Sequence, residues 1–129
     1  MRGFAKALTL LLAVGMMTTA ATFAPKTWIS KGFTGVKANV GSVMATKDGD
    51  KIVLTLSDDF KVPDAPAPHW QIVDSKGNTY LLNRLVIKGD KYNKTITLPP
   101  YIKDVAKVQI WCAFAEVLLG EAPFDTVVK

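Results

Sequence analysis

Few residues of this chain have side chains capable of chemistry, and two of those types occur only once. Cys112 is the only cysteine and His69 the only histidine among the 129 residues. A thiol beside an imidazole can act as a nucleophile, but that chemistry also needs an oxyanion hole and a group that orients the base. No motif marks either of these, so we expect no classical enzyme. His69 follows a proline-rich stretch, residues 62–68, which predicts an exposed loop position for it.

The N-terminus determines the compartment in which Cys112 must function. Arg2 and Lys6 precede an apolar run at residues 7–17, and small residues follow at positions 18–21. This is the pattern of a secretory signal peptide, residues 1–21, cleaved after Ala20 or Ala21. An uncleaved anchor helix is the alternative. We expect a secreted or periplasmic protein with no membrane span after cleavage, because no second apolar run has the length to cross a bilayer.

In an oxidising compartment a single cysteine has four possible fates. Cys112 is buried as an inert core residue, pairs with a thiol of another molecule, binds a prosthetic group, or acts as a redox thiol. Free cysteines are among the most buried residue types, which favours the core. A reactive thiolate would need a nearby cation, helix N-terminus or metal, and the neighbouring sequence offers none. The residues alone leave these alternatives open.

Metal and haem sites have little support in the residue types. One cysteine and one histidine do not make a structural zinc site without two carboxylates, and we expect no metal site. Haem or another prosthetic group held through Cys112 would take His69 or Met44 as the opposite ligand, but the chain has no Cys-x-x-Cys-His motif. No cofactor is therefore required by the sequence.

Two tryptophans are candidates for a binding face. Trp70 lies directly after the proline-rich stretch and His69, so we expect it to make a partly hydrated apolar contact with a ligand. Trp111 lies within an apolar segment, which predicts a core position, although it too is a candidate for the binding face.

The charge of the mature chain argues against nucleic acid as a partner. Two of the 16 Lys and Arg residues are removed with the signal peptide. The mature chain then has 14 basic and 11 acidic residues, which gives a net charge of +3. The lysines are scattered, and Arg84 is the only arginine left. Nucleic-acid-binding domains usually have a denser basic stripe. We expect a monomer whose partner is an unidentified redox or envelope protein.

The mature sequence has the pattern of an all-β domain, either a β-sandwich or a Greek-key barrel of short antiparallel strands. Residues 51–56 alternate, with Ile52, Leu54 and Leu56 on one face. Residues 70–74 and 79–83 flank a hairpin turn at 75–78, and residues 94–98 form another β-branched strand. A single helical turn is expected at residues 101–106.

The segment around Cys112 predicts a strand over residues 108–114. One face would carry Val108, Ile110, Cys112 and Phe114, and the other Gln109, Trp111 and Ala113. Because both faces are largely apolar, the strand is expected to be central in its sheet. The predicted organisation is a lead-in at 22–30, one β domain at 31–124 and a C-terminal tail at 125–129.

Part of this segment resembles a known family. The sequence Ile110-Trp-Cys112 with Phe114, and the closing Gly120-Glu-Ala-Pro-Phe124, are similar to the end of the DM-thirteen domain. Weaker similarities at residues 32–35, 37–43 and 54–60 extend the resemblance over residues 31–124. Where the family commonly has a Gly-Pro-Asp-Leu turn, this chain has residues 65–70. The resemblance implies an extracytoplasmic β-rich domain whose cysteine, here Cys112, serves in redox or electron transfer.

Two functions are thus predicted for different reasons. The resemblance implies an exported redox or electron-transfer accessory domain that uses Cys112. The residues alone favour a non-enzymatic extracytoplasmic binding or envelope-interaction module, in which Cys112 only fills the core. A disulfide-linked dimer through Cys112 is a third possibility, which burial of the thiol would disfavour. The accessibility of the native thiol discriminates between the two main functions.

Overall fold

The computed structural model describes residues 25–129, in which the chain forms ten strands and no helix. The predicted signal peptide, residues 1–21, lies outside the described residues. Sheet A contains, in spatial order, β1 (Lys26–Ile29), β2 (Val43–Asp48), β3 (Lys51–Leu56) and β8 (Thr95–Thr97). Sheet B contains β10 (Val117–Val128), β9 (Val105–Cys112), β4 (Pro68–Val73) and β5 (Thr79–Arg84). A small separate ladder joins β6 (Val86–Lys88) and β7 (Lys91–Tyr92).

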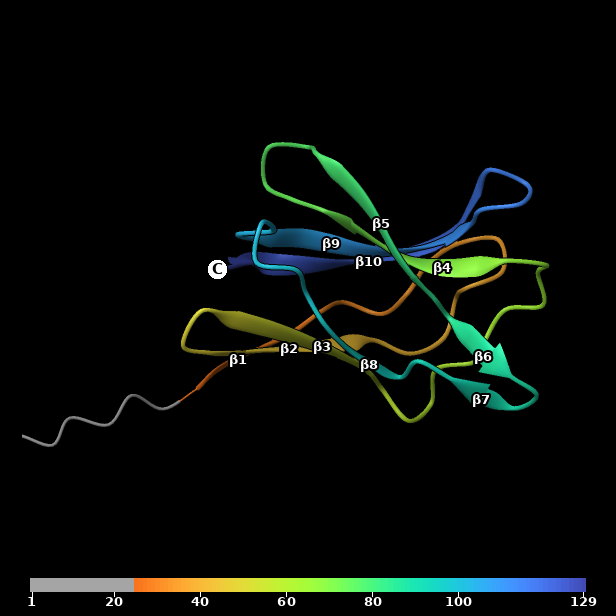
Figure 1. Ribbon diagram of the computed structural model, residues 1–129, viewed down its shortest axis with the longest axis horizontal. Coiled ribbons are helices and arrows are strands. Elements are labelled where there is room, and N and C mark those ends of the chain that lie inside the picture. The colour runs from red at the N-terminus through yellow and green to blue at the C-terminus, as the bar shows by residue number, and fades with distance from the viewer. Residues whose placement is uncertain (1–24) are drawn as a thin grey trace, which may run out of the picture.

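The two four-stranded sheets are antiparallel throughout and pack face to face (Figure 1). This confirms the all-β, sandwich-like fold expected from the sequence. β5 and β8 form the sheet edges nearest the viewer in Figure 1, and β1 and β10 lie behind them. Within residues 25–129 no helix has the length and apolarity needed to span a bilayer.

The core lies between the sheets because every second residue of the inner strands is apolar. In β3 the inward residues are Ile52, Leu54 and Leu56, as the alternation predicted. In β9 they are Val108, Ile110 and Cys112. β9 lies between β10 and β4, which confirms the central position predicted from its two apolar faces.

The turn between β4 and β5 is the predicted hairpin turn. Gly77 has a φ of +86°, a conformation that side-chain-bearing residues rarely adopt. The Asp74 carboxylate accepts the backbone N–H groups of Lys76 at 3.0 Å and Asn78 at 2.8 Å. These bonds satisfy main-chain donors that the loop leaves without ladder partners, so the sequence 74–78 fixes the register of the hairpin.

Four local expectations differ from the structure. In place of the helical turn expected at residues 101–106, residues 99–102 form a hydrogen-bonded turn, in which the Ile102 N–H donates to the Pro99 carbonyl at 3.1 Å, and β9 then begins at Val105. Phe114 is 78 % exposed in the β9–β10 turn, because the strand ends at Cys112. Residues 26–29 of the predicted lead-in form β1, and residues 125–128 of the predicted tail complete β10.

The outer edge of β10 is covered by the chain segment that follows β1. Backbone N–H groups of Lys31, Thr34 and Lys37 donate to carbonyls of β10 at 2.9 to 3.0 Å. Gly35 and Gly120 make this possible, since a Cβ on Gly35 would lie 2.3 Å from the Gly120 Cα. Residues 31–38 therefore act as a partial fifth strand that closes one edge of sheet B.

Candidate functional site

Cys112 ends β9 with its side chain directed into the sandwich. It is 1 % exposed and lies opposite Pro68 in β4. Its Sγ accepts the backbone N–H of Ala115 at 3.5 Å, and the next residue, Ala113, donates its N–H to the Ala67 carbonyl at 2.9 Å. The thiol is thus enclosed by the β9–β10 turn on one side and the start of β4 on the other.

The main-chain surroundings of this thiol favour its ionised form. The N–H of Ala115 is the largest influence and lowers the pKa of Cys112, while burial opposes it. The N–H groups of Ala67 and Phe114 and the positive charge of Lys37 lower this pKa further, so that it lies below the ordinary thiol value. Lys37 is itself anchored, since its Nζ donates to the Asp64 carbonyl at 2.8 Å. A lowered pKa is what a reactive thiol needs, but solvent access is missing.

His69 and Cys112 lie on opposite faces of sheet B. The directly opposite residue to His69 in β9 is Trp111, one position before Cys112, and adjacent residues of a strand point to opposite faces. His69 belongs to β4 and not to an exposed loop, it is half-buried, and its Nδ1 lies 2.9 Å from the Ala67 carbonyl oxygen. The structure therefore does not bring the two predicted ligands together.

A prosthetic group held through Cys112 does not fit these residues. His69 points away from the thiol, and Met44, the other proposed ligand, is 39 % exposed on the far side of sheet A. Cys112 is 1 % exposed, with Pro68 opposite it and the Ala115 N–H bonded to its sulfur. Within residues 25–129 no three His, Cys, Asp or Glu side chains gather in a way that would hold a metal ion.

Trp70 lies in the core and Trp111 on the surface, the reverse of the positions predicted for them. Trp70, expected at a wet surface, is completely buried, and its Nε1 donates to the Asn93 carbonyl at 2.9 Å. Trp111, expected in the core, is on the outward side of β9 and only partly buried. The reason is the register: β4 begins at Pro68, so Pro68, Trp70 and Ile72 take the inward positions.

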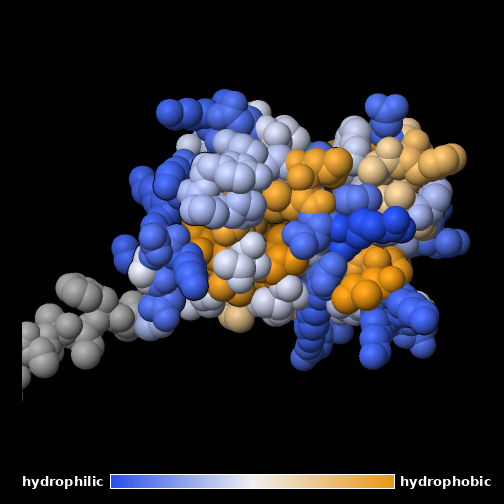
Figure 2. All heavy atoms as spheres, in the orientation of Figure 1, coloured by the Kyte–Doolittle hydropathy of each residue, from blue (hydrophilic) through white to orange (hydrophobic). Residues whose placement is uncertain are grey.

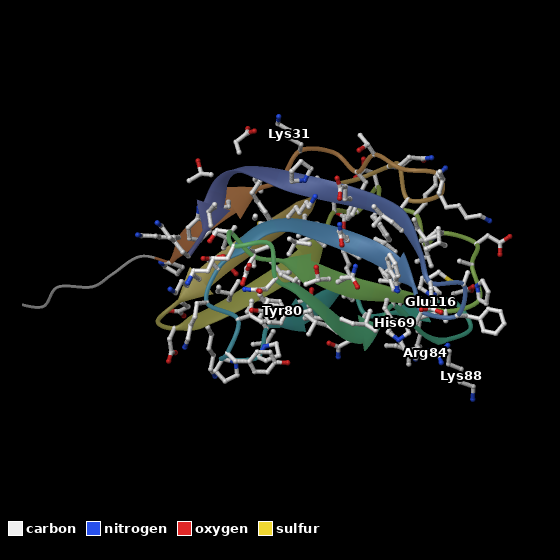
Figure 3. The ribbon with its side chains drawn as sticks, turned by 90° about the horizontal axis from the view of Figure 1, so that it is seen from above. Lys31, His69, Tyr80, Arg84, Lys88 and Glu116 are labelled. Atoms are coloured by element: carbon white, nitrogen blue, oxygen red, sulfur yellow. The ribbon has the colours of Figure 1, made fainter. Side chains whose placement is uncertain are left out.

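Trp111 lies in a row of side chains that crosses the outward surface of sheet B. Its direct neighbours are Leu118 in β10 and His69 in β4, and His69 is opposite Arg84 in β5. We call this surface the Trp111 face and define it by Trp111, Leu118, His69 and Arg84. Figure 3 looks onto it and shows His69 and Arg84 close together at one end, with Glu116 beside them. An aromatic ring, an aliphatic side chain and a guanidinium are thus adjacent and accessible.

A hydrogen-bonded polar row lies next to the Trp111 face. Gln71 Nε2 donates to Gln109 Oε1 at 2.7 Å, Gln109 Nε2 donates to Glu121 Oε1 at 2.9 Å, and Lys107 Nζ lies 3.2 Å from the same oxygen. The bond from Gln109 is the largest influence on Glu121 and lowers its pKa, burial opposes this, and Lys107 adds a further lowering. These hydrogen bonds hold the four side chains in a fixed arrangement beside the Trp111 face.

Sequence reasoning missed most of these neighbours. Alternation along β9 did place Gln109 and Trp111 on one face, but Arg84, Gln71, Leu118 and Glu121 belong to other strands. Only the pairing register makes them adjacent, and no single strand of the sequence contains that information.

The grooves described on the surface lie away from these residues. One of 430 Å³ lies between the ends of β1 and β10, lined by Lys26, Thr27, Trp28, Thr126, Val127 and Lys129. Another of 290 Å³ lies on sheet A next to Ile29, Met44 and Lys94. Neither includes Cys112, His69, Trp70 or Trp111, so they add no chemistry to the candidate site.

Comparison of the chain with protein-family models, with curated proteins and with solved structures gave no match.

Proposed function

We propose that this protein is a non-enzymatic extracytoplasmic binding module, which recognises an envelope protein through the Trp111 face. The observation that carries the proposal is the contrast between two neighbours in β9. Cys112 is 1 % exposed in the core, whereas Trp111 is partly exposed between Leu118 and His69. Tryptophan and arginine are the residue types that most often dominate the energy of protein interfaces.

The composition of the surrounding surface supports a protein partner. Phe114, 78 % exposed, adds apolar area in the adjoining β9–β10 turn. Beside Arg84, His69 and Glu116 provide a polar rim at the same end of the molecule (Figure 3). A partly apolar centre with a charged rim is the usual composition of a protein interface.

The resemblance to the DM-thirteen domain belongs to the same proposal. It rests on Ile110-Trp-Cys112 and on Gly120-Glu-Ala-Pro-Phe124. Gly120 lies where residues 31–38 approach β10, and Phe124 is 8 % exposed in the core. The motif residues thus have structural roles, and we propose that the chain is an exported, DM-thirteen-like domain.

The test is site-specific photo-crosslinking in the exporting cell. A photoreactive residue replacing Leu118 is expected to give a discrete adduct, and Trp111→Ala or Arg84→Glu in the same chain should reduce the adduct about tenfold, the effect of losing a hot-spot residue. The matched control places the same residue at Met44, which is 39 % exposed on the other sheet. Equal adducts from Leu118 and Met44, unaffected by the two substitutions, would contradict the proposal.

A second candidate function, supported by the surroundings of the thiol, is the redox role. The N–H groups of Ala115, Ala67 and Phe114 lower the pKa of Cys112, as a thiolate-stabilising site would. The step would be thiol–disulfide exchange: the Cys112 thiolate attacks a partner disulfide, a mixed disulfide forms, and the partner's second sulfur leaves as a thiolate. The β9–β10 turn would have to open first, because it covers the sulfur.

Native intact mass with and without a thiol-alkylating reagent separates the two functions. Labelling of Cys112 in the folded protein, or a mixed-disulfide mass, would support the redox role. Labelling only after unfolding would support the binding module. In that case the Cys112→Ala variant should fold normally. Its free energy of unfolding should be lower by about 1 to 2 kcal/mol, because the buried sulfur is removed.

A further inference from the structure

β5 is an open edge of sheet B. The sheet order ends at β5, and in residues 25–129 no strand pairs with its free side. The opposite edge, β10, is covered by hydrogen bonds from residues 31–38. An uncovered edge presents main-chain N–H and C=O groups that can pair with another strand.

The main chain of Leu81 is directed towards this free side. The Asp74 N–H donates to the Asn78 carbonyl at 3.0 Å, which makes this a hydrogen-bonded pair at the base of the hairpin. Hydrogen-bonded and non-hydrogen-bonded pairs alternate along an antiparallel ladder. The pair Gln71 and Leu81, three positions further along, is therefore non-hydrogen-bonded, and the N–H and C=O of Leu81 point away from β4.

The part of β5 before Arg84 lacks the charged residues and prolines that usually keep edge strands from pairing. Residues 79–83, Thr-Tyr-Leu-Leu-Asn, include no charged residue and no proline, and Leu81 is 51 % exposed. The two edges of sheet A are less suited to pairing, since β1 begins with the charged residue Lys26 and β8 has only three residues. β5 does have a bulge, but it follows Leu81, so the register from Thr79 to Leu81 is regular.

The sequence of this edge is complementary to itself. Around Leu81 the residues are symmetric in character: Tyr80 and Leu82 are apolar and partly buried, and Thr79 and Asn83 are polar and exposed. An antiparallel pair of two such strands places Leu81 opposite Leu81 and Tyr80 opposite Leu82. A closed two-fold interface requires this kind of self-complementarity.

We propose that β5 is a dimerisation edge, which pairs antiparallel with β5 of a second copy so that Leu81 lies on the two-fold axis. The two B sheets then form one continuous eight-stranded sheet. Figure 2, in the orientation of Figure 1, shows apolar side chains gathered on the side where β5 and β8 lie, and pairing covers part of this surface. The proposal goes beyond the binding function and replaces the monomer expected from the sequence.

The dimer also affects the geometry of binding. Both copies contribute their Trp111 faces to the same side of the continuous sheet, since pairing of Leu81 with Leu81 keeps equivalent faces on one side. Arg84 of each copy lies near the new interface, because it ends β5. Dimerisation itself does not depend on the Trp111 face.

The first test measures the mass of the exported protein in solution by analytical ultracentrifugation over a range of concentrations. We expect the mass to rise to twice that of the monomer, and Leu81→Lys to shift the midpoint concentration at least tenfold upwards. The control is Ile29→Lys, which places the same charge on an aliphatic residue of similar exposure, 60 %, in an edge strand of sheet A. A monomer mass at all concentrations, or a dimer lost in Ile29→Lys and kept in Leu81→Lys, would overturn the proposal.

The second test measures the register. In Leu81→Cys the two introduced thiols would face each other across the axis, with Cα atoms about 5.5 Å apart, a separation that a disulfide can span. In Thr79→Cys they would be offset by four residues, or about 13 Å. We expect an oxidative cross-link in the first variant only, and the buried Cys112 takes no part. Equal cross-linking in both variants, or none in either, would contradict pairing at Leu81.

Discussion

The two tryptophans at positions 70 and 111 show how strongly a single register decides the role of a residue. Trp70 is fully buried with its Nε1 bonded to the Asn93 carbonyl, whereas Trp111 lies on the outward surface beside His69. One residue type therefore contributes to stability at one position and is available for binding at the other.

Replacement of each tryptophan by phenylalanine separates these roles. Trp70→Phe leaves a cavity and an unpaired Asn93 carbonyl, so it should lower the free energy of unfolding by about 2 to 3 kcal/mol. Trp111→Phe should change it by less than about 1 kcal/mol, as partly exposed substitutions usually do. Urea denaturation followed by circular dichroism measures both values. If the two variants lose equal stability, the assignment of core and face is wrong.

At the same scale, the sequence predicted the chemical types of the site residues but not their grouping. Cys112 was correctly placed on the face shared by Val108 and Ile110. The possible partnership of Cys112 with His69 could not be judged, because it depends on whether Pro68 or His69 is opposite Cys112. A shift of one residue in that register would place His69 on the same face as the thiol.

At the scale of the strands, Glu121 connects β10 to β9 and makes stability depend on pH. The Gln109 bond and Lys107 lower the pKa of Glu121 in the folded protein below its ordinary value of 4.5. Ionised Glu121 therefore stabilises the fold above that value, and the stabilisation is lost as the pH falls through the folded-state pKa.

Glu121→Gln should accordingly weaken the loss of stability in acid. Between about pH 6 and about pH 3, wild type should lose more stability than the variant, by less than about 1 kcal/mol because the group is partly exposed. Thermal melts across this range measure the difference. Glu116→Gln, in the exposed β9–β10 turn, is the matched control and should follow wild type. An acid profile of Glu121→Gln identical to that of wild type would rule out this contribution.

Strand positions were largely predictable, whereas the contacts between them were not. The alternation in residues 51–56 and the turn at 75–78 were correct because both depend on local residue preferences. The covering of β10 by residues 31–38 was not foreseen, since it depends on two glycines 85 positions apart in the chain, Gly35 and Gly120.

Gly120→Ala tests this covering contact. A Cβ at position 120 would lie 2.0 Å from the Ala38 carbonyl oxygen, so the backbone of residues 35–38 would have to move away from β10. We expect the free energy of unfolding to fall by about 1 to 3 kcal/mol, the usual range for overpacking a close contact. Gly32→Ala is the matched control, because a Cβ there would meet only the Gly41 carbonyl oxygen at 3.6 Å, an ordinary contact distance. A loss in Gly120→Ala no larger than in Gly32→Ala would contradict the close packing.

At the scale of the whole molecule, the two sheets divide the candidate functions between an interior and a surface. The interior holds Cys112 and Trp70, and the outward surface of sheet B holds His69, Trp111 and Arg84. Binding by the surface requires no opening of the sandwich, whereas use of the thiol requires the β9–β10 turn to open. The fold as it stands is therefore better suited to the proposed binding role.

The extent of the folded domain provides a final test at this scale. Residues 125–128 complete β10, and Val128, which is fully buried, pairs with Val105 at the start of β9. Truncation after Phe124 should lower the free energy of unfolding by about 2 to 3 kcal/mol, the value of burying one valine side chain together with its ladder bonds. Removal of Lys129 alone should have no measurable effect, because this residue is exposed and outside the strand. Chemical denaturation of the two truncated proteins gives the comparison. If both truncated proteins retain the stability of the intact chain, residues 125–128 do not contribute to the fold, and β10 effectively ends at Phe124.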